Sequence, residues 1–107
     1  LLGGLFESLI TLSVRVYAQQ AEAQVFHFRT AAGEREVDLI VERPDRRFIG
    51  IEIKLTTTVG ERDYRHLAWL KRKVGDRMLD AIVITTGRKA YRRADGVGVV
   101  PAALFGP

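Results

Sequence analysis

Two segments of the chain carry apolar residues at the intervals of three and four that are typical of amphipathic helices, residues 5–17 and 61–74. The second segment ends in a basic run, 71–73, and is followed by Gly75, as suits a helix C-terminus. We expect the first helix to pack against the rest of the chain. Its main stripe and the residues that widen it are Leu5, Leu9, Leu12 and Val16, with Phe6, Ile10 and Tyr17 beside them.

Shorter apolar runs, separated by turn-like stretches, predict five strands. In the third strand three isoleucines alternate with polar positions, so Glu52 and Lys54 project together from the opposite face. The predicted element order is α-β-β-β-α-β-β. The strands are expected at residues 25–29, 36–42, 48–55, 81–86 and 97–100.

Length and composition indicate one compact domain over residues 1–107, because the chain is 47% hydrophobic and 28% charged. The absence of cysteine excludes disulfides, thiolate zinc sites and cysteine nucleophiles, and nothing in the sequence favours secretion. No apolar run approaches the roughly 20 residues that span a bilayer, so we expect a cytoplasmic protein without a membrane partner. Because Met78 is the only methionine, we expect a fragment of a longer polypeptide.

The balance of charge favours an anionic partner. Lysine and arginine number 17 against 13 acidic residues, which gives a net charge of +4 and suits nucleic acid. One basic group surrounds Tyr91 after a predicted strand and is a candidate for phosphate contacts, although such runs also occur as plain solvated surface. This group is Arg88, Lys89, Arg92 and Arg93. No phosphate-binding loop motif occurs, so we expect no ATP site in this fragment.

Three polar residues interrupt the apolar strands in a pattern that predicts metal-dependent chemistry. Asp38 lies in the second strand, and Glu52 lies fourteen positions later in the third, across a hairpin of plausible length. Magnesium is commonly held by one or two carboxylates with water and substrate phosphate. Lys54, on the same face as Glu52, could orient or deprotonate the attacking water, or offset charge on the phosphate in the transition state.

This combination resembles the PD-(D/E)xK nuclease superfamily, whose core is αβββαβ. More narrowly, Gly4-Leu5-Phe6-Glu7, Glu36-Val37-Asp38 and Gly50-Ile51-Glu52-Ile53-Lys54 resemble the C-terminal domain of unknown function that follows a P-loop module in bacterial and archaeal ATPases. The resemblance spans nearly the whole chain. It implies an α/β fold of restriction-endonuclease-like type, with a mixed central sheet flanked by helices.

The same resemblance implies roles for individual residues. Asp38 and Glu52 would bind Mg²⁺ or Mn²⁺, Lys54 would assist catalysis, and Glu7 of the first helix would complete the site. Alternatively, Glu7 is an ordinary acid that favours the N-terminal turn of its helix. A polar residue of the second helix, Arg65 or His66, could also lie near the metal. One departure is that valine, and not proline, precedes the aspartate, which weakens only the literal motif.

The sequence therefore predicts a Mg²⁺-dependent nuclease-like domain that acts on DNA and is attached to an N-terminal ATPase module of the same chain. One alternative is a catalytically inactive nuclease fold that binds nucleic acid or forms homo-oligomers for that ATPase. A second alternative is a structural domain in which Asp38, Glu52 and Lys54 form only surface ion pairs. Metal binding separates the first hypothesis from both alternatives.

Overall fold

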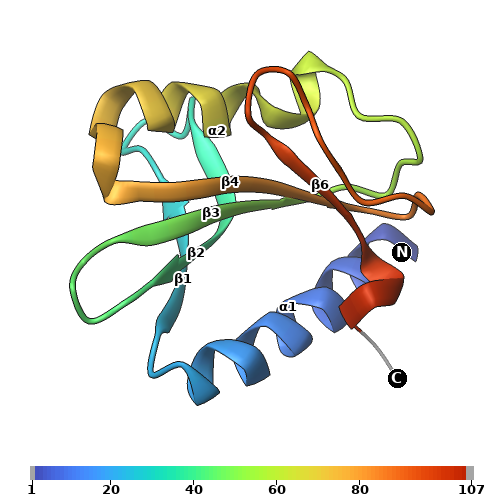
Figure 1. The fold of residues 1–107 in the computed structure, drawn as a ribbon, viewed down its shortest axis with the longest axis horizontal. Helices are drawn as coiled ribbons and strands as arrows, with labels where there is room; N and C mark the ends of the chain where they lie inside the picture. Colours follow the sequence, from blue (N-terminus) through green and yellow to red (C-terminus); the bar gives the residue numbers. More distant parts are fainter. Residues whose placement is uncertain (1, 106–107) are drawn as a thin grey trace.

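The computed structural model describes residues 2–105 and shows a mixed α/β fold in which helices cover both faces of a six-stranded sheet (Figure 1). The helices and strands follow the order α1 (Leu2–Gln20), β1 (Gln24–Arg29), β2 (Glu36–Glu42), β3 (Phe48–Ile53), α2 (Glu61–Val74), β4 (Met78–Thr85), β5 (Tyr91–Arg92) and β6 (Gly98–Pro101). Two short 3-10 helices, η1 (Gly75–Arg77) and η2 (Ala102–Phe105), precede β4 and follow β6. The expected αβββαβ order is confirmed.

The sheet has an antiparallel half and a parallel half, and the short strand β5 pairs antiparallel with β6 at the edge of the parallel half. Its strand order is β1-β2-β3-β4-β6-β5. β1, β2 and β3 pair antiparallel, whereas β3, β4 and β6 run parallel to one another. The helix α2 makes the crossover between β3 and β4, as parallel neighbours require. The carboxyl ends of β3, β4 and β6 therefore lie along one edge of the sheet.

Each face of the sheet has its own hydrophobic core. On one face Leu67 and Leu70 of α2 pack with Val37, Val83 and other buried residues. Gly50 of β3 lies under α2, where an added Cβ would come within 2.8 Å of the Leu67 side chain. Only glycine allows the helix to approach the sheet this closely.

The other core lies between the sheet and α1. Ile10 and Val14 of α1 are buried against Leu39, Ile51 and Ile53. The alternation expected in β3 is confirmed, because its isoleucines face α1 while Gly50 and Glu52 face α2.

The first helix is confirmed, but the packing expected of its main stripe is wrong. The sheet receives the neighbouring stripe of Phe6, Ile10 and Val14. The residues of the main stripe point away from the sheet and are about half exposed or more: Leu5, Leu9, Leu12 and Val16. The structure also ends β3 at Ile53, two residues earlier than expected, so Lys54 directly follows the strand. It starts β4 three residues earlier than expected and adds β5, which is too short for a sequence pattern to reveal. Among residues 2–105, no helix combines the length and hydrophobicity needed to cross a membrane.

Candidate metal site at the divergence of β2 and β3

Asp38 and Glu52 come together where β2 and β3 separate. The last backbone pair of the two strands joins Leu39 to Ile51, so the next residues, Asp38 and Glu52, lie just beyond the ladder. The pairing of β3 with β4 continues through Glu52 and Ile53. Ile53 has therefore lost its partner strand on one side only, and its N–H donates instead to Asp38 Oδ2 at 2.7 Å.

An irregularity in β2 accompanies the placement of Asp38. Phe26 of β1 pairs with Ile40, and Phe28 pairs with Val37, so His27 alone faces both Asp38 and Leu39. This two-against-one arrangement is a β-bulge, which interrupts the alternation of side chains and can redirect one of them. The His27 ring Nδ1 lies 3.2 Å from the Asp38 carbonyl oxygen at the bulge. The Asp38 carboxylate is thereby free to reach across to β3.

Glu52 is a buried acid without enough partners. It is 5% exposed, and its Oε1 has no hydrogen-bond partner among the described residues. Burial, together with repulsion from the Asp38 carboxylate, raises the pKa of Glu52 to about 9. An orphaned buried oxygen is costly, and native structures rarely tolerate one without a further ligand.

Lys54 supplies the nearest cation. Its Nζ lies 3.8 Å from Glu52 Oε2, and its side chain is 37% exposed. The lysine therefore lies between the buried acid and solvent. The positive charge of Lys54 opposes the rise in the pKa of Glu52 but does not overcome it. Asp38, Glu52 and Lys54 thus form the cluster that the sequence predicts, with the two carboxylates inside and the ammonium at the rim.

Glu7 lies outside this cluster. It is exposed on α1, where it lines a shallow hollow with Ser8, Thr11 and Arg15. An added Cβ on Gly3 would lie 4.0 Å from Leu55, so the start of α1 is near the strand end that carries Lys54. Within residues 2–105, carboxylates and histidines nowhere gather in a group of three or more that could hold a metal ion. The role of Glu7 as an accessory acid stays a prediction.

Three cations, Arg65, Arg35 and Lys54, lie near His66 of α2. His66 accepts a hydrogen bond from the Glu36 N–H at 3.2 Å. Burial and the charges of Arg65, Arg35 and Lys54 lower the pKa of His66, so this ring is neutral at neutral pH. Arg35, which also stacks on Trp69 with its guanidinium 5.2 Å from the ring centre, has no distinguishing sequence signal.

The four basic residues expected to contact nucleic acid fall into two pairs. Arg92 is bound by Asp80 at 2.6 Å, and Arg93 donates to Tyr64 and to the Val59 carbonyl. Arg88 and Lys89 form no ion pair with any other described residue, and they line an open hollow of about 550 Å³ with threonine residues. Of the four residues, Arg88 and Lys89 are thus the two whose charges are not paired within the described part of the chain.

This hollow lies at the same edge of the sheet as the carboxylates. It is lined by Thr57, Thr85 and Thr86, and the Thr86 N–H donates to the Thr56 carbonyl at 3.1 Å. A second hollow of about 640 Å³ is lined by the two cations Lys54 and Arg62 and by the two acids Glu61 and Asp63. Ligands of open α/β sheets commonly bind at the carboxyl ends of parallel strands. Arg62 is a cation of this edge that sequence reasoning missed.

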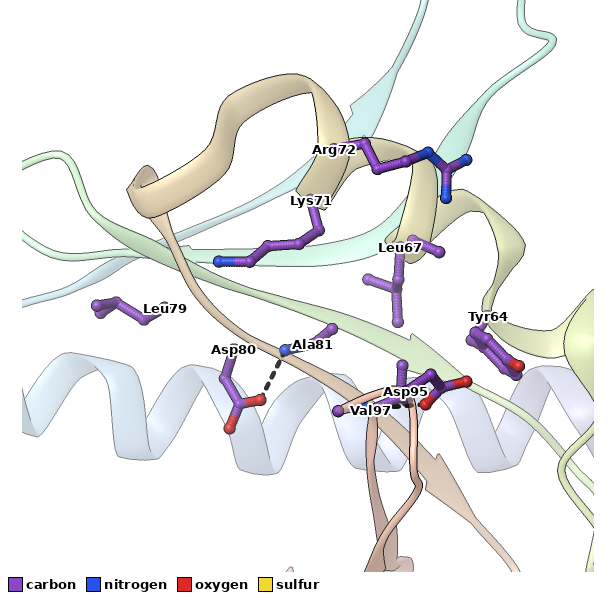
Figure 2. Close-up of a pocket in the computed structure, with 11 residues that line it drawn as sticks. Tyr64, Leu67, Lys71, Arg72, Leu79, Asp80, Ala81, Asp95 and Val97 are labelled. Carbon is purple, nitrogen blue, oxygen red and sulfur yellow. Dashed lines mark hydrogen bonds between the residues drawn. The ribbon is translucent and has the colours of Figure 1, made fainter.

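A more enclosed cavity of about 360 Å³ lies elsewhere, between α2, β4 and the turn before β6 (Figure 2). Three of its four charged residues already have partners among the described residues, and Arg72 is the exception. Lys71 donates to the carbonyls of Gly75 and Met78, and Asp80 binds Arg92. The cavity therefore offers mainly apolar walls, and none of the predicted catalytic residues lines it.

The site and the sheet define a mixed α/β domain with a pair of carboxylates and a lysine at one sheet edge. A family model described as Domain of unknown function (DUF4143) matches residues 2–105, and the chain belongs to this family. No curated protein and no solved structure matches the chain significantly.

Proposed function

We propose that this chain is a Mg²⁺-dependent nuclease-like domain of the PD-(D/E)xK type, which hydrolyses phosphodiester bonds in DNA and works with a P-loop ATPase module. The observation that carries the proposal is the buried, unpartnered Glu52 Oε1 beside Asp38. Two adjacent carboxylates that lack a compensating charge destabilise each other, and a divalent cation removes both the repulsion and the orphaned oxygen. Lys54 alone leaves both problems in place.

The donor set suits magnesium. Asp38 and Glu52 offer carboxylate oxygens, and Mg²⁺ is usually held by one or two carboxylates while it keeps several waters. When bound, such an ion polarises a phosphoryl oxygen and lowers the pKa of a bound water. Zinc fits this site less well, because zinc prefers cysteine and histidine ligands. The chain has no cysteine, and no histidine groups with the two carboxylates among the described residues.

The protein's own residues have separate tasks in this proposal. Asp38 and Glu52 hold the ion, and the hydrogen bond from the Ile53 N–H fixes the Asp38 carboxylate in one orientation. Lys54 lies at the surface of the site, where its ammonium can offset charge that builds on the phosphate or orient the attacking water. Arg62, Arg88 and Lys89 lie along the same edge and can contact neighbouring phosphates.

The test is calorimetric titration of Mn²⁺ and Mg²⁺ into the protein, followed by cleavage assays on plasmid and linear DNA. The wild type is compared with Asp38→Asn and Glu52→Gln, and Asp45→Asn serves as the matched control because this acid lies in an exposed turn. We expect heat of binding and DNA cleavage in the wild type and in the control, and neither in the two site variants. A wild type that binds no metal and cuts no DNA would overturn the proposal.

DNA binding is tested separately, because an inactive nucleic-acid-binding module is the alternative function. Replacing both Arg88 and Lys89 by glutamine should weaken binding and reduce the slope of log affinity against log salt by about 2. The matched control replaces Arg72 and Lys73, two exposed cations of α2, by glutamine. Metal-independent DNA binding that needs Arg88 and Lys89, without any cleavage, would favour the alternative.

A further inference from the structure

One end of the molecule carries the whole net charge of the chain. Two segments form this end: residues 42–47, which lead from β2 into β3, and residues 71–77, which close α2 and form η1. Together they hold seven cations and three acids, whereas the other ten cations of the chain are matched by ten acids. All seven cations are exposed. We call these two segments the basic end.

Hydrogen bonds to backbone carbonyls hold the two segments of the basic end together. Arg47 donates to the Asp76 carbonyl at 3.3 Å, and Arg77 donates to the Arg46 carbonyl at 3.2 Å. Ion pairs engage only two of the seven cations. The other five form no ion pair with any residue in 2–105: Arg46, Arg47, Lys71, Arg72 and Lys73. The basic end is therefore a positively charged surface on a connected part of the fold.

The enclosed cavity of about 360 Å³ adjoins the basic end, because Lys71 and Arg72 belong to both. The pairing of β4 with β6 begins only at Ile82, so residues 79–81 of β4 lie beside α2 without a β6 neighbour. Figure 2 shows Leu67 pointing from α2 toward β4 at this place. Apolar walls and unpaired cations thus meet at one site.

We propose that the cavity and the basic end together bind an acidic segment of a partner protein, with one large apolar side chain of that segment inserted into the cavity. Protein interfaces often place such an anchor in a pocket and polar contacts around it. The volume lies near the lower end of the ~300–1,000 Å³ of ligand pockets, so it suits a single side chain.

This inference goes beyond the proposed nuclease activity and does not depend on it. The basic end lies at the amino ends of β3 and β4. The cluster of Asp38, Glu52 and Lys54 lies at the carboxyl end of β3, at the opposite edge of the sheet. The two sites can therefore be tested separately.

The polar groups that line the cavity explain why the inserted group is apolar. Asp80 binds Arg92, and Asp95 accepts a hydrogen bond from the Val97 N–H at 3.1 Å. Lys71 donates to two backbone carbonyls. A polar group inserted among these residues would lose its water without gaining a free partner, whereas an apolar group would gain from burial.

Arg72 explains why the segment around the anchor is acidic. Tyr64, Ala68 and Arg72 recur every four residues, so one face of α2 overlooks the cavity and ends in an exposed, unpaired arginine. A guanidinium can bind a carboxylate through two parallel hydrogen bonds. We expect an acid next to the anchor to pair with Arg72, while the other cations of the basic end attract the acids that flank it.

A nucleic acid is the less suitable occupant of this site. Bases bind to proteins mainly by stacking on aromatic faces. Tyr64 is the only aromatic residue of the cavity, and the Arg93 guanidinium lies 4.7 Å from the centre of its ring. The three acids of the basic end also oppose a continuous phosphate backbone, whereas the carboxylates of a protein segment can be spaced to avoid them.

The probe is a fluorescently labelled peptide of glutamates and aspartates with one central phenylalanine or leucine. Its anisotropy is followed as the protein is added at physiological salt. We expect at least one of these peptides to bind at least about tenfold more tightly than the same peptide with a central serine, because the anchor is buried. A peptide whose acids are replaced by their amides should bind more weakly than its acidic counterpart.

Charge reversal at Arg72 tests the acidic contacts. Arg72→Glu should weaken binding of the acidic peptides at least about tenfold, because it places like charges together. Arg15→Glu is the matched control: it makes the same change of charge at an exposed position of α1, which covers the other face of the sheet.

Filling the cavity tests the anchor. Ala68→Leu should remove the preference for phenylalanine or leucine over serine and leave the binding of the serine peptide almost unchanged. Ala32→Leu, in the exposed turn between β1 and β2, is the control and should keep the preference. Circular dichroism of each variant checks that the fold is retained.

Equal affinity of the apolar and serine peptides for the wild type would overturn the proposal, as would equal binding by Arg72→Glu and Arg15→Glu. A third result would also overturn it and favour a nucleic acid: peptides that do not bind, together with duplex DNA whose affinity falls in Arg72→Glu but not in Arg15→Glu.

Discussion

Two carboxyl groups of this chain have pKa values shifted in opposite directions. Asp45 lies in the exposed turn between β2 and β3, where hydrogen bonds from Arg43 and from the Arg47 N–H lower its pKa to about 2. Glu52 lies only seven residues further along the chain, but burial and the neighbouring Asp38 raise its pKa to about 9. The protein supplies hydrogen-bond donors to the Asp45 carboxylate. It leaves one carboxyl oxygen of Glu52, Oε1, without a hydrogen-bond partner among the described residues.

The comparison distinguishes an acid whose charge is satisfied by the fold from a buried acid that lacks partners. Ion pairs between exposed side chains contribute little to stability, because water solvates both partners well. A buried, under-partnered acid destabilises the fold, and such groups occur mainly at functional sites. The contrast between Asp45 and Glu52 therefore supports the proposal that the pair of Asp38 and Glu52 binds a cation.

The largest expected effect is on catalysis. Asp38→Asn keeps the size of the side chain but removes its charge, so we expect DNA cleavage in Mg²⁺ to fall at least about 100-fold. Initial cleavage rates measure this loss. Asp45→Asn should cleave at the wild-type rate, and an equal loss in both variants would show that the contrast between the two acids has no functional meaning.

The next effect is on stability as a function of pH, without metal. Between pH 4.5, the ordinary pKa of a glutamate, and about 9, the folded protein keeps a proton on Glu52 that the unfolded chain has lost. Folding therefore becomes less favourable as pH rises through this window, by up to about 1.4 kcal/mol for each pH unit.

Urea unfolding at several pH values, with and without EDTA, measures this slope. Glu52→Gln should remove it and make the metal-free protein more stable at pH 8. Added Mn²⁺ should reverse the trend in the wild type, because metal binding releases the proton and strengthens as pH rises. A wild-type stability that rises with pH in EDTA would contradict the buried, protonated state of Glu52.

A third, smaller effect concerns the packing of β3. It distinguishes a loss of stability caused by packing at Gly50 from one caused by the charge of Glu52. Gly50→Ala places a methyl group within 2.7 Å of the Met78 side chain and 2.8 Å of Leu67. We expect a loss of about 1–3 kcal/mol in the free energy of unfolding, without any pH dependence of its own. Urea denaturation checks this expectation. Gly4→Ala is the control, since a Cβ there meets nothing within 4 Å and should not destabilise the exposed helix position.

The smallest effect is expected at Asp45 itself. Its lowered pKa means that its carboxylate favours the folded state above about pH 4, and that this contribution is lost as pH falls toward 2. Because the group is exposed, Asp45→Asn should leave thermal unfolding at pH 7 almost unchanged and alter only the acid end of the profile. A large loss of stability at pH 7 would show that the contacts of Asp45 contribute more to folding than an exposed ion pair does.

The sequence predicted that Asp38, Glu52 and Lys54 lie together better than it predicted their surroundings. The two-residue period of β3 placed Glu52 and Lys54 on one face, and hairpin geometry brought Asp38 beside them. The bulge at Asp38 and Leu39 was not predictable, because it depends on how β1 pairs with β2. Three partners of Arg92 and Arg93 were also hidden, since Asp80, Val59 and Tyr64 are distant in sequence.

The first helix shows a different limit. Leu9 and Ile10 are equally apolar, and each belongs to a stripe at helical spacing. Hydrophobic pattern alone cannot tell which stripe packs on the sheet, because both stripes have the spacing and hydrophobicity of a buried helix face. The structure assigns Ile10 to the sheet and leaves Leu9 exposed, at 56%.

The division of the sheet into an antiparallel and a parallel half has a consequence for the order of folding. β1, β2 and β3 are joined by short connections, so their contacts close small loops and can form early. β4 can pair with β3 only after α2 has crossed over the sheet. The pairing with β4 and the packing of α2 then bury Glu52. The burial of this acid then belongs to the late part of folding. Glu52→Gln should accordingly slow unfolding while it leaves the folding rate almost unchanged.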